Sequence, residues 1–233
     1  MPAQTKPIDV YYASTPNGHK VTIMLEELGV PYELKFIRIG RGDQFKPEFL
    51  AISPNNKIPA IVDPEGPDGT AISIFESGAI LKYLGQKFGQ FYPTAPREQV
   101  KVDEWLFWQM AGFGPMLGQN NHFSRYAPEK VPYAIKRYSD ETHRLYRVLN
   151  AQLEGKDFIT GQYSIADIAT IAWSNGYERY GIELAEFPHF AAWNARMNAR
   201  PAVQRALAIV VPPEQENNLA NDKEAQSVLF NQR

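Results

Sequence analysis

The sequence predicts a fold of the α/β plus all-α class, in which a small α/β domain precedes an all-helical one. Two observations lead to this prediction: β-rich runs alternate with helical patterns up to residue 90, and strand patterns nearly vanish beyond it. A third is a proline-containing segment that separates the two parts. We expect an α/β domain over residues 7–90, a linker over 91–96, a helical domain over 97–212 and a polar tail over 213–233.

The α/β domain begins with a β-rich run over residues 8–13, and a helical pattern follows it. Thr15 or Asn17 suits the N-cap of this helix. Gly29 is a suitable end for the helix, because Pro31 prevents its continuation. The chain therefore starts with a strand and an amphipathic helix joined by a short polar turn.

The remaining elements of this domain are shorter. Residues 32–39 alternate polar and apolar side chains and predict a strand, and the punctuated segment 42–54 predicts short helical turns. The runs 57–63 and 71–75 flank a turn-rich segment and predict an antiparallel hairpin, which a helix over 76–89 follows. The predicted order is β-α-β-α-β-β-α with a mixed sheet.

The second half of the chain has helical periodicity almost throughout, with patterns over 97–110, 132–155, 164–180 and 187–208. Three glycines and a proline over 111–121 predict a kink or break after the first of these helices. Ser164 and Asp167 form S-x-x-D, a relative of the capping box, and we assign them to folding rather than to catalysis. The tail is rich in Asn, Gln and Glu, so we expect it to be extended over the surface or disordered.

The composition excludes several classes of protein. The 233 residues include no cysteine, which excludes disulfides, thiolate metal sites and mechanisms that use a protein thiol. The four histidines match no compact metal motif, and a net charge of -2 without long runs of one sign provides no footprint for nucleic acid or an anionic membrane. We expect no metal, no nucleic-acid partner and no membrane partner. The N-terminal residues lack the apolar core of a signal peptide, so we expect a cytoplasmic location.

Two motifs in the first domain allow either a binding or a purely structural interpretation. Ile58-Pro59 stands at the start of a strand, where a trans proline would simply begin the strand. A cis bond would instead turn the backbone of Ile58 toward a peptide-like ligand. Glu76 and Ser77 stand at a helix N-terminus, where they are either ordinary first-turn residues or hold an ammonium and a carboxylate group.

The chain resembles the cytosolic glutathione transferases in an ordered set of motifs: SPNNKIPAIVD, FESGAI and, in the helical half, YSIADI. The resemblance spans approximately residues 7–210. The chain is most similar to the nu-class and fungal nitrogen-regulator-like branch of that family, through the runs STPNGHK, GDQF, WLFWQM and GPMLGQNNHF. The resemblance implies a thioredoxin-like N-terminal domain, an all-helical C-terminal domain, glutathione as cosubstrate and a homodimer.

The resemblance also implies roles for individual residues. Pro59 is expected to be cis, and the backbone of Ile58 is expected to pair with the cysteinyl unit of glutathione. Glu76 and Ser77 would hold the γ-glutamyl end, which suits its ammonium and carboxylate groups. The full set of glutathione-binding residues implied in this way is Thr15, Asn17, Gln44, Lys57, Ile58, Glu76, Ser77 and Arg137.

Three of these binding residues lie away from the γ-glutamyl group. Gln44 and Lys57 match positions near the cysteinyl-glycine part, where an amide and an ammonium suit peptide and carboxylate groups. Arg137 matches a position in the helical domain that holds glutathione or a disulfide ligand, sometimes across the dimer interface, although a solvated helix arginine is an equally simple interpretation. A group of aromatic residues in the helical half either lines the pocket of the second substrate or packs in the helical core: Trp105, Phe107, Trp108, Phe113 and Phe123.

The thiol of glutathione has a pKa of roughly 8.5, so an enzyme must stabilise the thiolate with a donor or a positive charge. Cysteine is absent, and the catalytic candidates that the resemblance leaves are Asn17, Thr15 and Tyr11. Asn17 offers an amide donor at a helix start, and Thr15 either donates its hydroxyl or serves as the N-cap. Tyr11 is either a catalytic phenol or a strand aromatic in the core. We expect His19 to be a packing or surface residue rather than a base.

We therefore expect a glutathione transferase with glutathione-dependent disulfide-bond reductase activity, and peroxidase activity as a further expectation. Its substrates would be small electrophiles, disulfides or peroxides. Because the chain has no cysteine, two glutathione molecules must supply both sulfurs when a disulfide is reduced. The alternative is a non-catalytic protein of the same fold that binds glutathione or another ligand, or regulates. The short N-terminal segment before the first strand argues against a prion-like regulator.

Overall fold

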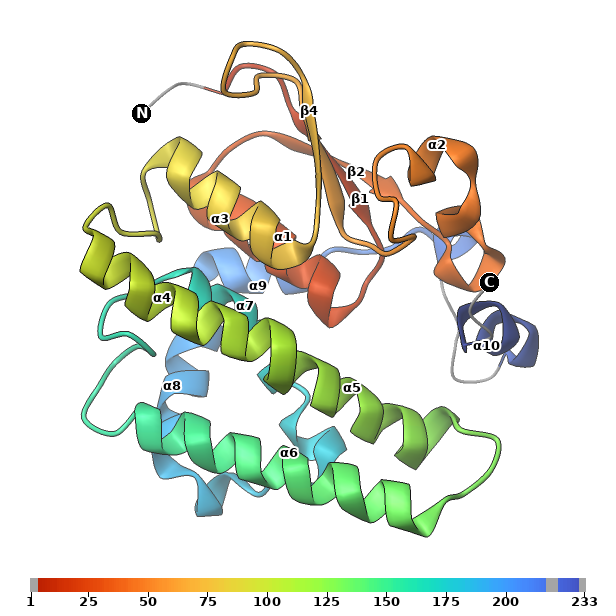
Figure 1. Cartoon of the computed structure of the whole chain (residues 1–233), viewed down its shortest axis with the longest axis vertical. Coiled ribbons are helices and arrows are strands. Elements are labelled where there is room, and N and C mark those ends of the chain that lie inside the picture. Colours follow the sequence, from red (N-terminus) through yellow and green to blue (C-terminus); the bar gives the residue numbers. More distant parts are fainter. Residues whose placement is uncertain (1–3, 217–221, 231–233) are drawn as a thin grey trace. The chain divides into compact units, whose positions relative to one another are not determined.

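The computed structural model describes residues 4–216 and 222–230, and the chain divides into two compact units (Figure 1). The first unit comprises the described residues of Met1–Phe88 and of Arg205–Arg233, and the second comprises Gly89–Gln204. The boundary after Phe88 lies close to the one expected after residue 90. The far end of the chain differs from the prediction, because residues 205–212 group with the α/β unit and not with the helical one.

The sheet of the first unit has the strand order β2-β1-β3-β4. β1 (Ile8–Tyr12) pairs in parallel with β2 (Tyr32–Phe36) and antiparallel with β3 (Ala60–Asp63), which forms a hairpin with β4 (Ile72–Phe75). The helices α1 (Pro16–Leu28) and α3 (Ser77–Phe88) lie side by side on one face, and the short α2 (Pro47–Leu50) lies on the other side (Figure 1). The predicted β-α-β-α-β-β-α order and the thioredoxin-like fold are confirmed.

The first helix forms where the local signals placed it. Thr15 is its N-cap, with the side-chain oxygen accepting from the backbone N–H of Gly18 at 3.1 Å. Gly29 ends it with a φ of 65°, the left-handed conformation that glycine adopts without strain. A glycine is also needed at position 18, because a Cβ on Gly18 would meet the carbonyl oxygen of Ala13 at 2.3 Å. The turn before the helix is therefore packed tightly against its first residues.

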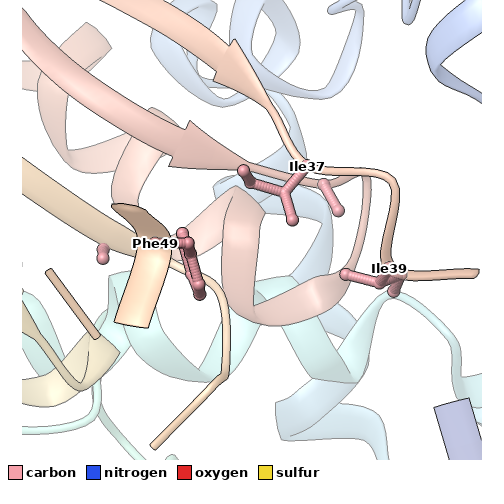
Figure 2. Close-up of a cluster of buried hydrophobic side chains, with 5 residues drawn as sticks. Ile37, Ile39 and Phe49 are labelled. Atoms are coloured by element: carbon pink, nitrogen blue, oxygen red, sulfur yellow. The ribbon is translucent and has the colours of Figure 1, made fainter. Parts of the chain in front are cut away.

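Between β2 and β3 the chain makes two 3₁₀ turns, η1 (Ile39–Arg41) and η2 (Asp43–Phe45), before α2. Figure 2 shows the buried apolar cluster beneath this segment, in which Ile37, Ile39 and Phe49 pack together with Ala13 and Ala60. Partly buried side chains surround the cluster, namely Tyr11, Ile52, Ile58 and Leu229. The predicted short helical turns are thus present, and apolar burial holds them against the sheet.

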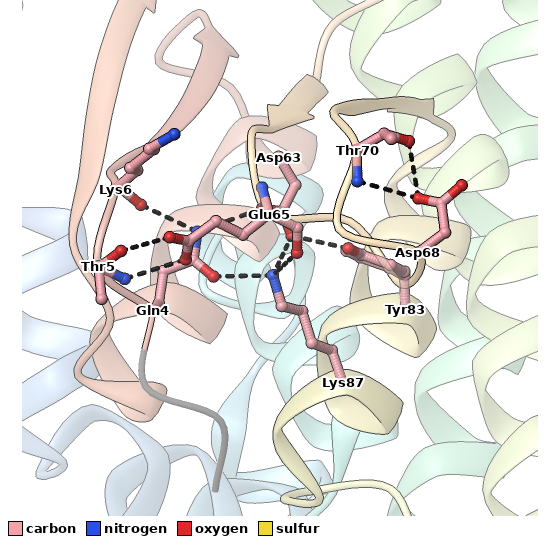
Figure 3. Close-up of polar contacts among 9 residues, drawn as sticks. All are labelled: Gln4, Thr5, Lys6, Asp63, Glu65, Asp68, Thr70, Tyr83 and Lys87. Carbon is pink, nitrogen blue, oxygen red and sulfur yellow. Dashed lines mark hydrogen bonds and ion pairs between the residues drawn. The ribbon is translucent and has the colours of Figure 1, made fainter.

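A polar network lies at the end of β3, away from the apolar cluster that contains Ala60 at its start (Figure 3). The fully buried carboxylate of Asp63, at the end of β3, accepts hydrogen bonds from Lys87 at 2.5 Å, Tyr83 at 2.7 Å and Gln4 at 3.2 Å. Burial by itself raises the pKa of Asp63, but these donors lower it overall. The network joins the N-terminal segment, the hairpin and the last turn of α3, so we interpret it as structural.

Helices make up the second unit, and no strand occurs among its residues. Its elements are α4 (Pro96–Trp108), α5 (Gly114–Asn121), α6 (Pro132–Gln152), α7 (Ile165–Ser174), η5 (Tyr177–Tyr180), η6 (Leu184–Glu186) and α8 (Pro188–Asn198), with two π-helical turns, η3 (Gln109–Phe113) and η4 (His122–Tyr126). The short α9 (Pro201–Leu207) spans the division between the two units. The all-helical second domain is confirmed.

The irregularity expected over 111–121 is present as a π turn and not as a break in the helix. Instead the chain stays helical through the π turn η3, in which the N–H of Gly114 bonds the carbonyl of Gln109, five residues earlier. Gly114 keeps helical dihedrals, φ -60° and ψ -53°, and Pro115 stands in the first turn of α5. Pro115 has no N–H to donate, and it stands where the π turn passes into α5. The glycines and the proline thus change the hydrogen-bond register without ending the helix.

The capping box predicted at the start of α7 is confirmed. Asp167 is fully buried, and its two carboxylate oxygens accept from the N–H of Ser164 at 3.1 Å, the N–H of Ile159 at 2.9 Å and the indole Nε1–H of Trp193 at 2.9 Å. These partners come from the segment that precedes α7 and from α8. The motif therefore supports folding, as predicted.

The predicted extended or disordered tail is wrong for the described residues. After the 3₁₀ turn η7 (Pro213–Gln215), residues 222–230 contain the helix α10 (Lys223–Phe230), which contacts η1 (Figure 1). Its side chain Leu229 packs on the apolar cluster of the α/β unit that Figure 2 shows. Residues 217–221 and 231–233 of the predicted tail lie outside the described residues.

Candidate functional site

A polar cavity of about 140 Å³ lies in the α/β unit where three chain segments meet. These are the start of α1, the turn before β3 and the junction between β4 and α3. The residues that line it are Asn17, Ser53, Asn55, Lys57, Ile58, Pro59, Phe75, Glu76 and Ser77. Six of them had been singled out from the sequence, so tertiary folding gathers most of the predicted site into one place.

The turn before β3 forms one wall of the cavity. The Ile58-Pro59 peptide bond is cis, which excludes the trans interpretation. Ile58 precedes the first ladder pair of β3, between Tyr11 and Ala60, so it lies just beyond the regular sheet. The hydroxyl of buried Ser53 donates to the carbonyl of Lys57 at 2.9 Å and holds this turn in place. Ile58 thus lines the cavity in a turn that Ser53 holds in place.

The β4–α3 junction forms the opposite wall. Glu76 has a φ of 69°, a left-handed conformation that costs a non-glycine residue about 1–3 kcal/mol and is concentrated at functional sites. The residue is exposed, whereas Ser77, the first residue of α3, is buried. Asn55 Nδ2 lies 3.5 Å from Glu76 Oε1, at the limit of a hydrogen bond. The junction therefore offers a carboxylate and a hydroxyl side by side at a helix N-terminus, where the dipole favours anions.

A buried lysine lies behind this junction. Lys20 of α1 is 1% exposed, and its ammonium donates to the hydroxyl oxygen of Ser77 at 3.4 Å. Burial lowers its pKa to about 7, and the nearby charge of Glu76 opposes this shift. The sequence interpretation missed Lys20, although a signal was present: it stands four residues before Met24 and so extends the apolar stripe of α1.

The catalytic candidates occupy different places. Asn17, in the first turn of α1, is half-buried and lines the cavity. Thr15 does not line it, and its side-chain oxygen is engaged as the N-cap acceptor. Tyr11 does not line it either: its ring lies 5.9 Å from that of Phe49, against the apolar cluster of Figure 2. Burial, and then the charge of Asp9, raise the pKa of Tyr11, so the phenol stays protonated at neutral pH.

His19 and Gln44 also lie outside the cavity lining. The Nδ1 of His19 is 3.3 Å from the hydroxyl of Tyr12, and burial lowers the pKa of the imidazole, which fits the expected packing role. Gln44 is 3% exposed, and its Nε2 donates to the carbonyl of Ile39 at 2.9 Å. Its Oε1 is buried and has no hydrogen-bond partner within the described chain. An acceptor left in this state is suited to a ligand donor.

Arg137 lies on α6 in the helical unit and is exposed, so its role in ligand binding remains a prediction. The aromatic residues that the sequence analysis considered for the pocket of the second substrate mostly pack on one another in the helical unit. Ring centroids lie 5.1 Å apart for Trp105 and Trp108, and 5.0 Å apart for Trp108 and Phe113. Phe107 differs, because it is 61% exposed.

Two kinds of feature are missing from residues 4–216 and 222–230. No group of three or more His, Cys, Asp or Glu side chains is arranged to hold a metal ion there. In the same part of the chain, none of the helices has the length and apolar character needed to cross a bilayer.

Comparison with known proteins identifies two domain families in the chain. Residues 15–87 match the glutathione S-transferase N-terminal domain, and residues 113–201 match the glutathione S-transferase C-terminal domain. The disulfide-bond oxidoreductase YfcG of Escherichia coli is 54% identical over 202 residues, which cover 86% of this chain and 94% of that protein.

Two solved structures are also similar. A glutathione transferase from Burkholderia graminis, with two glutathione molecules bound per subunit, has a TM-score of 0.83 at 44% identity and covers 86% of this chain and 87% of that one. A glutathione transferase from Pseudomonas putida, with one glutathione disulfide bound per subunit, has a TM-score of 0.84 at 41% identity, covering 90% of this chain and 95% of that one.

Proposed function

The chain belongs to the glutathione S-transferase family, and from this premise we propose that it is a glutathione-dependent disulfide-bond reductase. We assign it to the nu-class and fungal nitrogen-regulator-like branch, as its motifs indicate. One observation carries the proposal: the cavity joins a cis-proline turn to a Glu-Ser helix start in a chain that contains no cysteine. The bound thiol must then come from glutathione. The disulfide-bond activity in the name of YfcG and the glutathione disulfide bound by the Pseudomonas putida structure support it.

We infer that the cavity receives the γ-glutamyl end of glutathione. Its volume of about 140 Å³ is well below the roughly 300–1,000 Å³ of pockets that enclose whole ligands, so the rest of the tripeptide extends beyond it. The carboxylate would lie at the start of α3, on Ser77 and near the ammonium of Lys20, and the ligand's ammonium would lie on Glu76. The backbone of Ile58 would then pair with the cysteinyl unit. Lys57 and Gln44 would face the glycine end of glutathione. Arg137 of the helical domain would hold glutathione or a disulfide ligand.

The reduction proceeds by two thiol–disulfide exchanges. The thiolate of one glutathione attacks a sulfur of the substrate disulfide, forms a mixed disulfide and releases the first substrate thiolate. The thiolate of a second glutathione attacks the glutathione sulfur of that mixed disulfide, which forms glutathione disulfide and releases the second substrate thiolate. Both substrate thiolates take up the protons that the glutathione thiols lost. The protein contributes no sulfur, in keeping with its lack of cysteine.

We propose Asn17 as the main donor to the attacking thiolate. It lines the cavity, carries two amide N–H groups and stands in the first turn of α1, where the helix dipole adds positive potential. Thr15 can still donate its hydroxyl proton while its oxygen accepts from Gly18. Tyr11 is the weakest of the three candidates, because its ring packs against the apolar cluster.

The test is turnover of purified protein with glutathione and 2-hydroxyethyl disulfide, followed as formation of glutathione disulfide. Parallel assays with chlorodinitrobenzene and a hydroperoxide test transferase and peroxidase chemistry. We expect the disulfide reaction to be the fastest of the three. Tight glutathione binding without turnover in any assay would replace the enzyme with a non-catalytic glutathione-binding or regulatory protein.

We further propose that the protein is a cytoplasmic homodimer without a metal cofactor. A glutathione-consuming reductase needs the reducing glutathione pool of the cytosol. Exposed apolar side chains such as Phe107 of α4, which is 61% exposed, provide surface that a second copy would cover. Light scattering of the purified protein tests the dimer, and a monomeric mass would rule out Arg137 acting across an interface.

A further inference from the structure

The C-terminal helix α10 folds back onto the loop that carries Gln44. Arg41 of this loop forms ion pairs with Asp222 at 3.2 Å and with Glu224 at 3.6 Å. Asp222 also starts the helix, since its carboxylate accepts from the N–H of Ala225 at 2.9 Å. One acidic residue therefore both begins α10 and joins it to the loop, across more than 180 positions of sequence.

Apolar contacts join the same two segments. Leu229 packs on the buried cluster that contains Ile37 and Ile39, and Ala225 is 3% exposed. The helix lies directly against Gly42, where an added Cβ would be 3.8 Å from Val228. Arg41 is half-exposed, so solvent and salt screen its ion pairs and the apolar contacts dominate.

The cluster under Leu229 is shared with the candidate site. Ile58, which lines the cavity, packs on this cluster, and the carbonyl of Ile39 in the cluster accepts from the side chain of Gln44. The loop itself is tied by Asp43, whose carboxylate binds Arg38 at 2.8 Å and Lys46 at 2.7 Å. Because these ion pairs make the loop rigid, it moves as a unit. The contacts that α10 makes with the outer face of the loop therefore also determine the position of Gln44.

We propose that α10 is a positioning element for glutathione: it holds the 38–46 loop and the Ile58 turn from behind, and so places Gln44 and Ile58 for the cysteinyl-glycine part of the ligand. The proposal rests on the proposed function, which supplies the ligand. The helix itself does not touch the ligand. Its contribution is to limit the movement of two groups that do, which lowers the cost of ordering them when glutathione binds.

The test compares Leu229→Asp with Val210→Asp in the full chain. Both changes introduce one carboxylate in place of an apolar side chain near the C-terminus, but Leu229 packs on the cluster whereas Val210 is 84% exposed. For Leu229→Asp we expect KM and Kd for glutathione to rise about tenfold while kcat at saturation stays within about twofold, the pattern of lost binding rather than lost chemistry. For Val210→Asp and for Leu229→Met we expect no change beyond about twofold.

Hydrogen exchange provides a readout that does not depend on glutathione. Leu229→Asp should speed exchange of the loop amides of Arg41 and Phe45, which bond the carbonyls of Arg38 and Gly42, and leave the amides of α3 unchanged. An unchanged KM, a fall in kcat alone, or an equal effect of Val210→Asp would overturn the proposal. Failure of the wild-type protein to bind or turn over glutathione would instead overturn the proposed function, and faster loop exchange would still show that α10 holds the loop.

Discussion

Two helix starts in this protein use the same kinds of residue for opposite purposes. At α7, Ser164 and Asp167 turn inward, and the buried carboxylate accepts from the backbone and from Trp193. At α3, Ser77 follows an exposed Glu76 with a left-handed φ, and both residues line a cavity. A serine and an acidic residue at a helix N-terminus therefore do not define a role. The role depends on whether tertiary packing supplies the donors or leaves the carboxylate facing a cavity.

The largest effect is expected from removing the inward-turned carboxylate. Asp167→Ala would leave the donors of Ile159, Ser164 and Trp193 buried without an acceptor and should lower the free energy of unfolding by about 4 kcal/mol. Asp167→Asn keeps one acceptor oxygen and should cost less. Urea denaturation measures both, with Asp157→Ala as control, because the Asp157 side chain is 71% exposed. A loss below about 1 kcal/mol would mean that α7 does not depend on its cap.

The start of α1 lies between the two cases, since Thr15 caps the helix and Asn17 faces the cavity. We expect Asn17→Ala to lower kcat/KM for disulfide reduction about 100-fold, as is typical for loss of a donor to a developing or bound anion, with little change in stability. Tyr11→Phe should change it less than about threefold, because the ring contacts are kept. The reverse ranking would move the thiolate donor to Tyr11.

The buried Lys20 behind the start of α3 should make the free energy of unfolding depend on pH. Its pKa of about 7 in the folded protein lies below the roughly 10.4 of an unfolded lysine, so the unfolded chain binds more protons between these values. The free energy of unfolding should therefore rise with pH above 7, by on the order of 2 kcal/mol up to pH 9, and Lys20→Met should flatten this rise.

Glutathione binding should have the opposite pH trend. The ammonium of Lys20 favours a carboxylate beside Ser77, so loss of its proton above pH 7 should weaken binding. Calorimetry across pH 6–9 on wild type and Lys20→Met measures this trend. Equal trends in the two proteins would show that another group titrates.

The smallest effect is expected from the outward-turned carboxylate. Glu76→Gln should raise Kd for glutathione about tenfold, because it removes a charge-assisted bond to the ligand's ammonium, and should change stability by less than about 0.5 kcal/mol. Glu48→Gln on α2, also exposed, is the matched control and should change neither. A stability loss as large as that of Asp167→Ala would mean that both helix starts are structural.

Local patterns were sufficient for the elements whose signals lie within a few residues. The N-cap and glycine end of α1, the β3–β4 hairpin and the capping box of α7 all follow from adjacent side chains and backbone geometry. The kink or break expected over 111–121 takes the form of a π turn, and the chain continues as α5 after it.

The sequence by itself determined the fold class, the absence of a protein thiol and most of the residues that line the cavity. Only the tertiary structure decided which of them meet: Asn17 faces the cavity while Tyr11 packs away from it, Lys20 is buried behind Ser77, and α10 returns to the loop of Gln44. The physical reason is the range of the interactions. Caps and turns are settled by neighbours in sequence, whereas burial, pKa shifts and helix docking depend on side chains brought together from distant positions.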